Sequence, residues 1–168
     1  MTNDDEPDAK AFFVDGRFEQ MARRPGGVPR EEAIERALAM IEENKPGFCD
    51  WLDRELAELG ELIRQNESQG ADQGDWTETA YLQCARMRDV GTTMGFELVT
   101  FVASNLCEIF QAVNDGAEYR GDLVDCHMQA MLLARQEQYR NLRPDQLPEL
   151  SGGLRRVVEY VPNKPPSA

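Results

Sequence analysis

Apolar residues repeat every three or four positions through most of this chain, and no segment alternates apolar and polar residues as a surface strand does. Two clear series are Ile34, Leu38, Ile41 and Leu52, Leu56, Leu59, Ile63. This spacing places side chains on one face of an α-helix. The sequence therefore predicts an all-α protein whose helices bury these faces against one another.

Proline, glycine and capping residues divide the pattern into six expected helices, at about 29–45, 50–65, 75–91, 97–114, 118–141 and 154–160. Pro46 should separate the first two, because proline cannot donate the helical hydrogen bond. Gly91 and Gly95 should flank a turn. Such helices predict an antiparallel, up-and-down bundle of four core helices, with an extra N-terminal helix and a short C-terminal helix.

The length of 168 residues suits a single domain with one core. We expect this domain at 28–160, preceded by an acidic, irregular arm at 1–27 and followed by a disordered tail at 161–168. Phe12, Phe13 and Phe18 could anchor the arm to the domain.

The composition excludes several classes of partner. A net charge of −13 disfavours nucleic acid and anionic membrane surfaces, because both need a basic face. No apolar run approaches the roughly 20 residues that span a bilayer. The acidic start, MTNDDEPDAK, does not resemble a signal peptide, so we expect a cytoplasmic protein.

The four cysteines, at positions 49, 84, 107 and 126, are too widely spaced for a zinc site, and there is one histidine. We expect free thiols, no metal and no cofactor. With no clear set of catalytic side chains, an enzyme with its own active site is the least favoured class, although abundant carboxylates leave it open.

Residues 82–107, LQCARMRDVGTTMGFELVTFVASNLC, carry the most distinctive pattern. This segment resembles histidine phosphotransfer (HPt) proteins of bacterial two-component phosphorelays. One branch of that family shows A-H-D-x-K-G-x-G-x-x-F-G-Y-P-L, followed by a helix that ends near L-C. Met94, Gly95, Phe96 and Leu98 occupy the F-G-Y-x-L positions, and Leu106-Cys107 matches the end of the helix.

The resemblance implies a phosphotransfer domain without its phosphoacceptor. Ala85 occupies the position of the acceptor histidine, Arg88 that of a lysine, and Asp89 that of a small glycine. An alanine methyl group cannot form a phosphoramidate. The implied protein is therefore a degenerate HPt-like adaptor, which binds a response-regulator receiver domain or a histidine kinase without acting as an enzyme.

The expected partner-binding residues are Tyr81, Ala85, Arg88, Asp89 and Thr92. With about 100° between successive residues, they form one continuous stripe on a helix. The alternative is an ordinary solvated helix face, on which such residues are common.

Two other functions stay open. His127 could be a displaced phosphoacceptor, but it shares a stripe with Leu123, Ala130 and Ala134, which predicts a buried packing role. The chain could also be a helical interaction module unrelated to phosphorelay. Its partner surface would then be the phenylalanine arm, or a homodimer could form through apolar helix faces.

Overall fold

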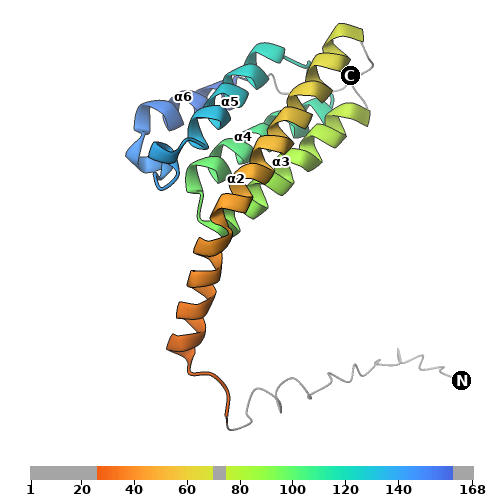
Figure 1. The fold of residues 1–168 in the computed structure, drawn as a ribbon. Helices are drawn as coiled ribbons and strands as arrows, with labels where there is room; N and C mark the ends of the chain where they lie inside the picture. Colours follow the sequence, from red (N-terminus) through yellow and green to blue (C-terminus); the bar gives the residue numbers. More distant parts are fainter. Residues whose placement is uncertain (1–25, 70–74, 161–168) are drawn as a thin grey trace, which may run out of the picture. The chain divides into compact units, whose positions relative to one another are not determined.

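The computed structural model describes residues 26–69 and 75–160, and every regular element in these ranges is helical. The α-helices are α2 (Arg30–Gln69), α3 (Asp75–Met94), α4 (Glu97–Asn114), α5 (Gly121–Ala134) and α6 (Pro148–Glu159), with short 3-10 helices η1 (Glu137–Tyr139) and η2 (Pro144–Gln146) (Figure 1). The all-α prediction is confirmed. The chain divides into two units, Met1–Ala39 and Met40–Ala168.

The predicted break at Pro46 is wrong, because α2 continues through this residue. The extra N-terminal helix and the first core helix are therefore one element of 40 residues. A proline inside a helix costs about 3 kcal/mol. Phe48 and Leu52, buried just after it, can each contribute roughly 1.5–3 kcal/mol, which is enough to offset that cost.

The described part of the first unit presents apolar side chains to solvent. Ile34 is 47% exposed and Leu38 is 57% exposed, so the helix face predicted here is not buried among the described residues. The predicted arm, with Phe12, Phe13 and Phe18, lies almost wholly outside the described residues, as does the tail from position 161.

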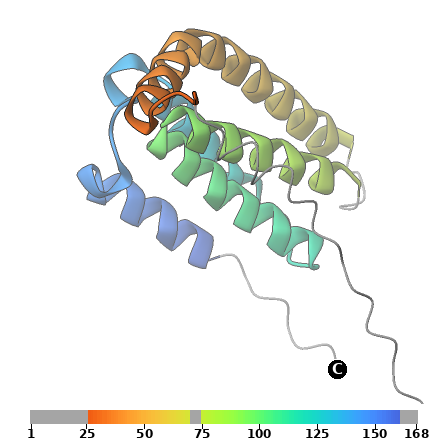
Figure 2. The same ribbon diagram turned by 90° about the horizontal axis from the view of Figure 1, so that it is seen from below.

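The core of the second unit is built around α4, which contacts α3, α5 and α6 (Figure 2). Ten of its 18 residues are buried, which makes it the central helix. Its largest fully buried side chain is Phe110. On the α2 side, the Phe48 ring packs against Phe96 at a tilt of 52°, with ring centroids 4.7 Å apart, and Arg86 of α3 donates to the buried Glu55 at 3.1 Å.

The α3–α4 connection depends on two glycines in different ways. Gly95 has φ of +76°, a left-handed conformation that favours glycine, and it makes the turn as predicted. Gly91 was expected to flank that turn but lies inside α3, where a Cβ atom would come within 3.1 Å of Thr100 Oγ1. Gly91 therefore permits the close approach of α3 and α4.

Two further helix boundaries differ from the prediction. α5 ends at Ala134 instead of near position 141, and the chain continues through η1 and η2. α6 begins at Pro148 instead of Leu154, so Gly152 and Gly153 lie within a helix. Proline is favourable in the first helical turn, and the buried Leu154 fixes α6 on the bundle.

Candidate functional site

The five predicted partner-binding residues lie along one side of α3, and we call this surface the α3 face. Tyr81, Ala85 and Arg88 are half-buried, whereas Asp89 and Thr92 are exposed. The α3 face is adjacent to the core stripe that contains the fully buried Ala80, Cys84 and Met87. The predicted register is therefore correct: one side of α3 is buried and the next is accessible.

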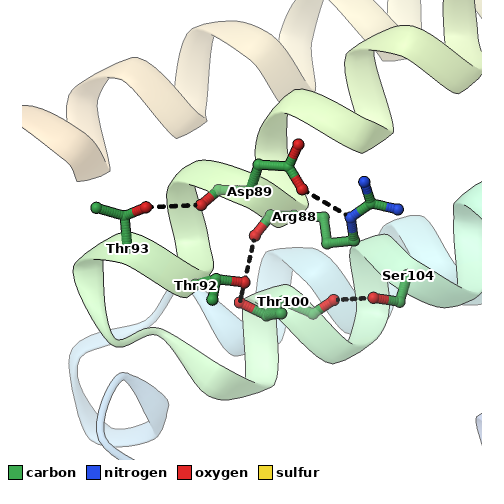
Figure 3. Close-up of polar contacts among 6 residues, drawn as sticks. All are labelled: Arg88, Asp89, Thr92, Thr93, Thr100 and Ser104. Atoms are coloured by element: carbon green, nitrogen blue, oxygen red, sulfur yellow. Dashed lines mark hydrogen bonds and ion pairs between the residues drawn. The ribbon is translucent and has the colours of Figure 1, made fainter. Parts of the chain in front are cut away.

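Arg88 and Asp89 form an ion pair within the α3 face, with Arg88 Nε donating to Asp89 Oδ1 at 2.8 Å (Figure 3). This hydrogen bond is the largest cause of the raised pKa of the Arg88 guanidinium. The two residues compensate one another, so the face offers little free positive charge.

The hydroxyl groups at this end of the bundle bond to backbone carbonyls. Thr92 Oγ1 donates to the Arg88 carbonyl at 2.9 Å, and Ser104 Oγ donates to the Thr100 carbonyl at 2.8 Å. The hydroxyls of Thr92 and Thr100 are 3.4 Å apart and link α3 to α4 (Figure 3). Thr100 and Ser104 were not among the predicted site residues, although their four-residue spacing on a helix could have indicated them.

On α4, the surface near the α3 face carries an aromatic ring and a second ion pair. The Arg155 guanidinium of α6 lies 5.6 Å from the ring centroid of Phe101 and donates to Glu108 at 2.9 Å. An open hollow of about 420 Å³ lies beside Phe101 at the α3–α4 turn, and Thr92 and Thr100 also line it. These groups form a mixed apolar and polar surface without an activated nucleophile.

Two thiols lie buried between α3 and α4. Burial raises the pKa of Cys84 well above its ordinary value and that of Cys107 to about 11, although the Arg88 charge acts in the opposite direction on Cys107. Both groups are therefore neutral thiols near pH 7, and neither supplies a thiolate. All four cysteines are free, as predicted.

His127 is fully buried, together with Leu123, Ala130 and Ala134 on the same stripe. Its Nδ1 donates to the Leu123 carbonyl at 2.8 Å, which fixes the tautomer in which Nδ1 carries the proton. Burial lowers the pKa of the imidazole, so the ring is neutral. The predicted packing position is confirmed, and a receiver domain could not reach this ring in the closed bundle.

Within the residues that the structure describes, no three His, Cys, Asp or Glu side chains gather as metal ligands would. None of the described helices is long and apolar enough to cross a membrane. Comparisons with protein-family models, curated proteins and solved structures gave no match to this chain. The resemblance to HPt proteins therefore stays a prediction.

Proposed function

We propose that this protein is an HPt-like signalling adaptor that binds a receiver domain or a histidine kinase through the α3 face and accepts no phosphoryl group. One observation supports this proposal most. Ala85, which aligns with the acceptor histidine, lies half-buried at the middle of an accessible helix face, between Tyr81 and Arg88.

The chemistry of the surrounding groups supports binding without transfer. A phosphoryl acceptor must be a nucleophile that the partner can reach. Ala85 offers only a methyl group, and the Thr92 hydroxyl is bonded to a backbone carbonyl. Cys107 is a buried, neutral thiol, and His127 is enclosed in the core. None of these groups combines exposure with activation.

Binding by a receiver domain tests the adaptor function directly. Arg88→Glu should weaken the complex about tenfold in isothermal titration, because it places two adjacent carboxylates where a cation was. Arg54→Glu is the matched control, since Arg54 is an exposed cation on α2. Equal affinity of the wild type and Arg88→Glu for every receiver domain tested would contradict this use of the α3 face.

Phosphotransfer from a phosphorylated receiver domain tests the missing acceptor. The wild type should remain unlabelled, and Ala85→His should gain label, because the half-buried site lets an imidazole reach solvent. His127→Asn, made in the Ala85→His background, should retain that label. Label on the wild type would refute the proposal. If neither the wild type nor Ala85→His is labelled, the proposed link to phosphorelay is refuted.

A second candidate function is a helical interaction module outside phosphorelay, and the exposed Ile34 and Leu38 favour it. Solvent-exposed apolar residues on one helix stripe are typical of association surfaces. Under this alternative, light scattering should show a mass above the monomer for the wild type and a monomer for Ile34→Asp/Leu38→Asp. A wild-type monomer at every concentration tested would count against self-association.

A further inference from the structure

A groove of about 600 Å³ runs between α2 and α5 in the second unit. We call its apolar lining residues the floor, and these are Leu56, Ala57, Gly60, Ile63, Met128 and Leu132. Leu132 is 39% exposed, so the groove is accessible to solvent at this residue. None of these residues belongs to the α3 face, and neither helix of the groove is α3.

Polar contacts close the two ends of the groove. At one end, Nη1 of Arg135, the residue directly after α5, donates to both carboxylate oxygens of Asp53 on α2, at 2.5 and 2.7 Å. At the other end, the Tyr119 hydroxyl, just before α5, donates to Glu67 Oε1 at 2.9 Å. The two helices therefore run antiparallel and hold the apolar floor open between these contacts.

The two ends differ in charge. Asp53 and Arg135 neutralise one another. Glu67 and Asp125 lie at the opposite end. Burial is the largest cause of the raised pKa of the Tyr119 hydroxyl, and the two carboxylates raise this pKa further. Asp125 has no cationic partner among the described ion pairs. This end of the groove is acidic and suits a cation.

The residues that line the groove favour one mode of peptide recognition over the others. Strand addition needs an exposed sheet edge, and the described residues contain no strand. Proline-rich segments need an aromatic-lined groove, and no aromatic side chain lines this one. Recognition of phosphorylated groups needs free arginines, whereas Arg64 and Arg135 are each paired with a carboxylate. An aliphatic, methionine-containing groove fits an amphipathic helix.

The dimensions agree with this occupant. The groove follows α2 from Asp53 to Glu67, which is about 21 Å or four helical turns. Gly60 lies between these ends, and a Cβ atom added there would have no neighbour within 4 Å. The missing side chain therefore leaves room for an apolar side chain from outside.

We propose that the groove between α2 and α5 binds an amphipathic helix of a partner protein. Its apolar side chains lie on the floor formed by Leu56, Gly60 and Met128, and its basic N-terminal turn lies against Glu67 and Asp125. The positive end of the helix dipole adds to the attraction at these carboxylates. The partner helix then runs antiparallel to α2. This surface does not depend on the proposed phosphorelay function.

A designed peptide serves as the probe. It contains about 18 residues, with leucines repeating every three or four positions and two lysines in its first turn. One comparison peptide replaces these lysines with glutamates, and another scatters the leucines around the helix. The full chain should bind the lysine peptide saturably, the glutamate peptide about tenfold more weakly, and the scattered peptide not at all.

Variants of the protein locate the binding. Gly60→Phe fills the groove and should weaken peptide binding at least tenfold, whereas Gly47→Phe, on the same helix with equally open space, should leave it unchanged. Leu132→Glu should also weaken peptide binding. Leu132 is exposed on α5, so this substitution does not require the fold to accommodate a large side chain. Circular dichroism checks that each variant keeps its helices.

The proposal fails if the wild type shows no saturable binding of the lysine peptide up to about 1 mM. It also fails if Gly60→Phe and Leu132→Glu bind the peptide as the wild type does, or if the scattered peptide binds equally well. Binding that prefers the glutamate peptide would overturn the proposed orientation of the partner helix.

Discussion

Replacing Asn105 with leucine should stabilise the protein. Asn105 lies on α4 with no exposed surface, and neither its Nδ2 nor its Oδ1 has a hydrogen-bond partner among the described residues. A buried amide without partners costs about 1–3 kcal/mol relative to hydration in the unfolded chain. Leucine has the same branching at Cγ, so it can replace the amide without opening a cavity.

The expected gain combines three contributions. Removing the unpaired amide contributes about 1–3 kcal/mol, and the better helix propensity of leucine adds roughly 0.5 kcal/mol. The larger methyl groups oppose this gain through overpacking, which typically costs about 1–3 kcal/mol in a dense core. We therefore expect a net stabilisation of about 0.5 kcal/mol, or a rise in Tm of roughly 1–2 °C for a chain of this size.

Urea unfolding followed by circular dichroism measures this difference as a shift in the midpoint at constant slope. Asn44→Leu is the matched control: Asn44 is exposed, so the same substitution should change stability by no more than about 0.5 kcal/mol. A loss of stability above about 1 kcal/mol in Asn105→Leu would refute the reasoning, because it would mean that the amide is satisfied or that α4 cannot accept the methyl groups.

Three further outcomes follow from local geometry. Asp89→Gly should strengthen receiver binding about fivefold in titration, because it frees the Arg88 guanidinium; unchanged binding would contradict a role for this cation. Gly91→Ala should destabilise the fold by about 1 kcal/mol in urea unfolding, since the new methyl group comes within 3.1 Å of Thr100 Oγ1. A stabilised variant would contradict this expectation, because it would show that α3 and α4 can separate. Folding lowers the pKa of His127, so the unfolded chain binds a proton at this residue more readily than the folded protein does. The contribution of His127 to stability is therefore present above the unfolded pKa of about 6.5 and is lost as the pH falls from there toward the folded pKa. His127→Leu should flatten that dependence in unfolding measured from pH 7 to 5, and an unchanged slope would assign it to other groups.

The core was predictable from the sequence because packing follows periodicity. Leu52, Leu59 and Ile63 were placed on one stripe of a helix, and all three are buried. The bounds of α4 agree with the expected 97–114 because Gly95 and the Asn114-Asp115-Gly116 turn mark both of its ends. Periodicity and turn residues together therefore fixed the central helix and the register of the α3 face.

The predicted ends of other helices failed where tertiary packing outweighed local preference. Pro46 and the Gly152-Gly153 pair disfavour a helix, yet both lie within one, because buried neighbours such as Phe48 and Leu154 contribute more than these residues cost. The exposure of Leu38 shows a second limit of prediction from the sequence. Its spacing predicts an apolar face, but spacing alone cannot say whether another element covers that face.

The site was predictable as a set of positions and not as a set of interactions. Spacing placed Arg88 and Asp89 on the same face, but it could not show that they pair with each other. Likewise, the sequence did not single out Gly60, since the groove around it depends on the distance between α2 and α5. Contacts between elements far apart in the sequence leave no periodic signal.

The polar groups of the α3 face also limit how a partner can bind there. Arg88 Nε already donates to Asp89, and the Thr92 hydroxyl is bonded to a backbone carbonyl, so docking meets side chains that are already partly satisfied. A partner that uses the Arg88 charge must compete with Asp89, which lowers the net gain from each new ion pair. Affinity should therefore come mainly from contact with the half-buried Tyr81 and Ala85, while Arg88 selects among partners by charge.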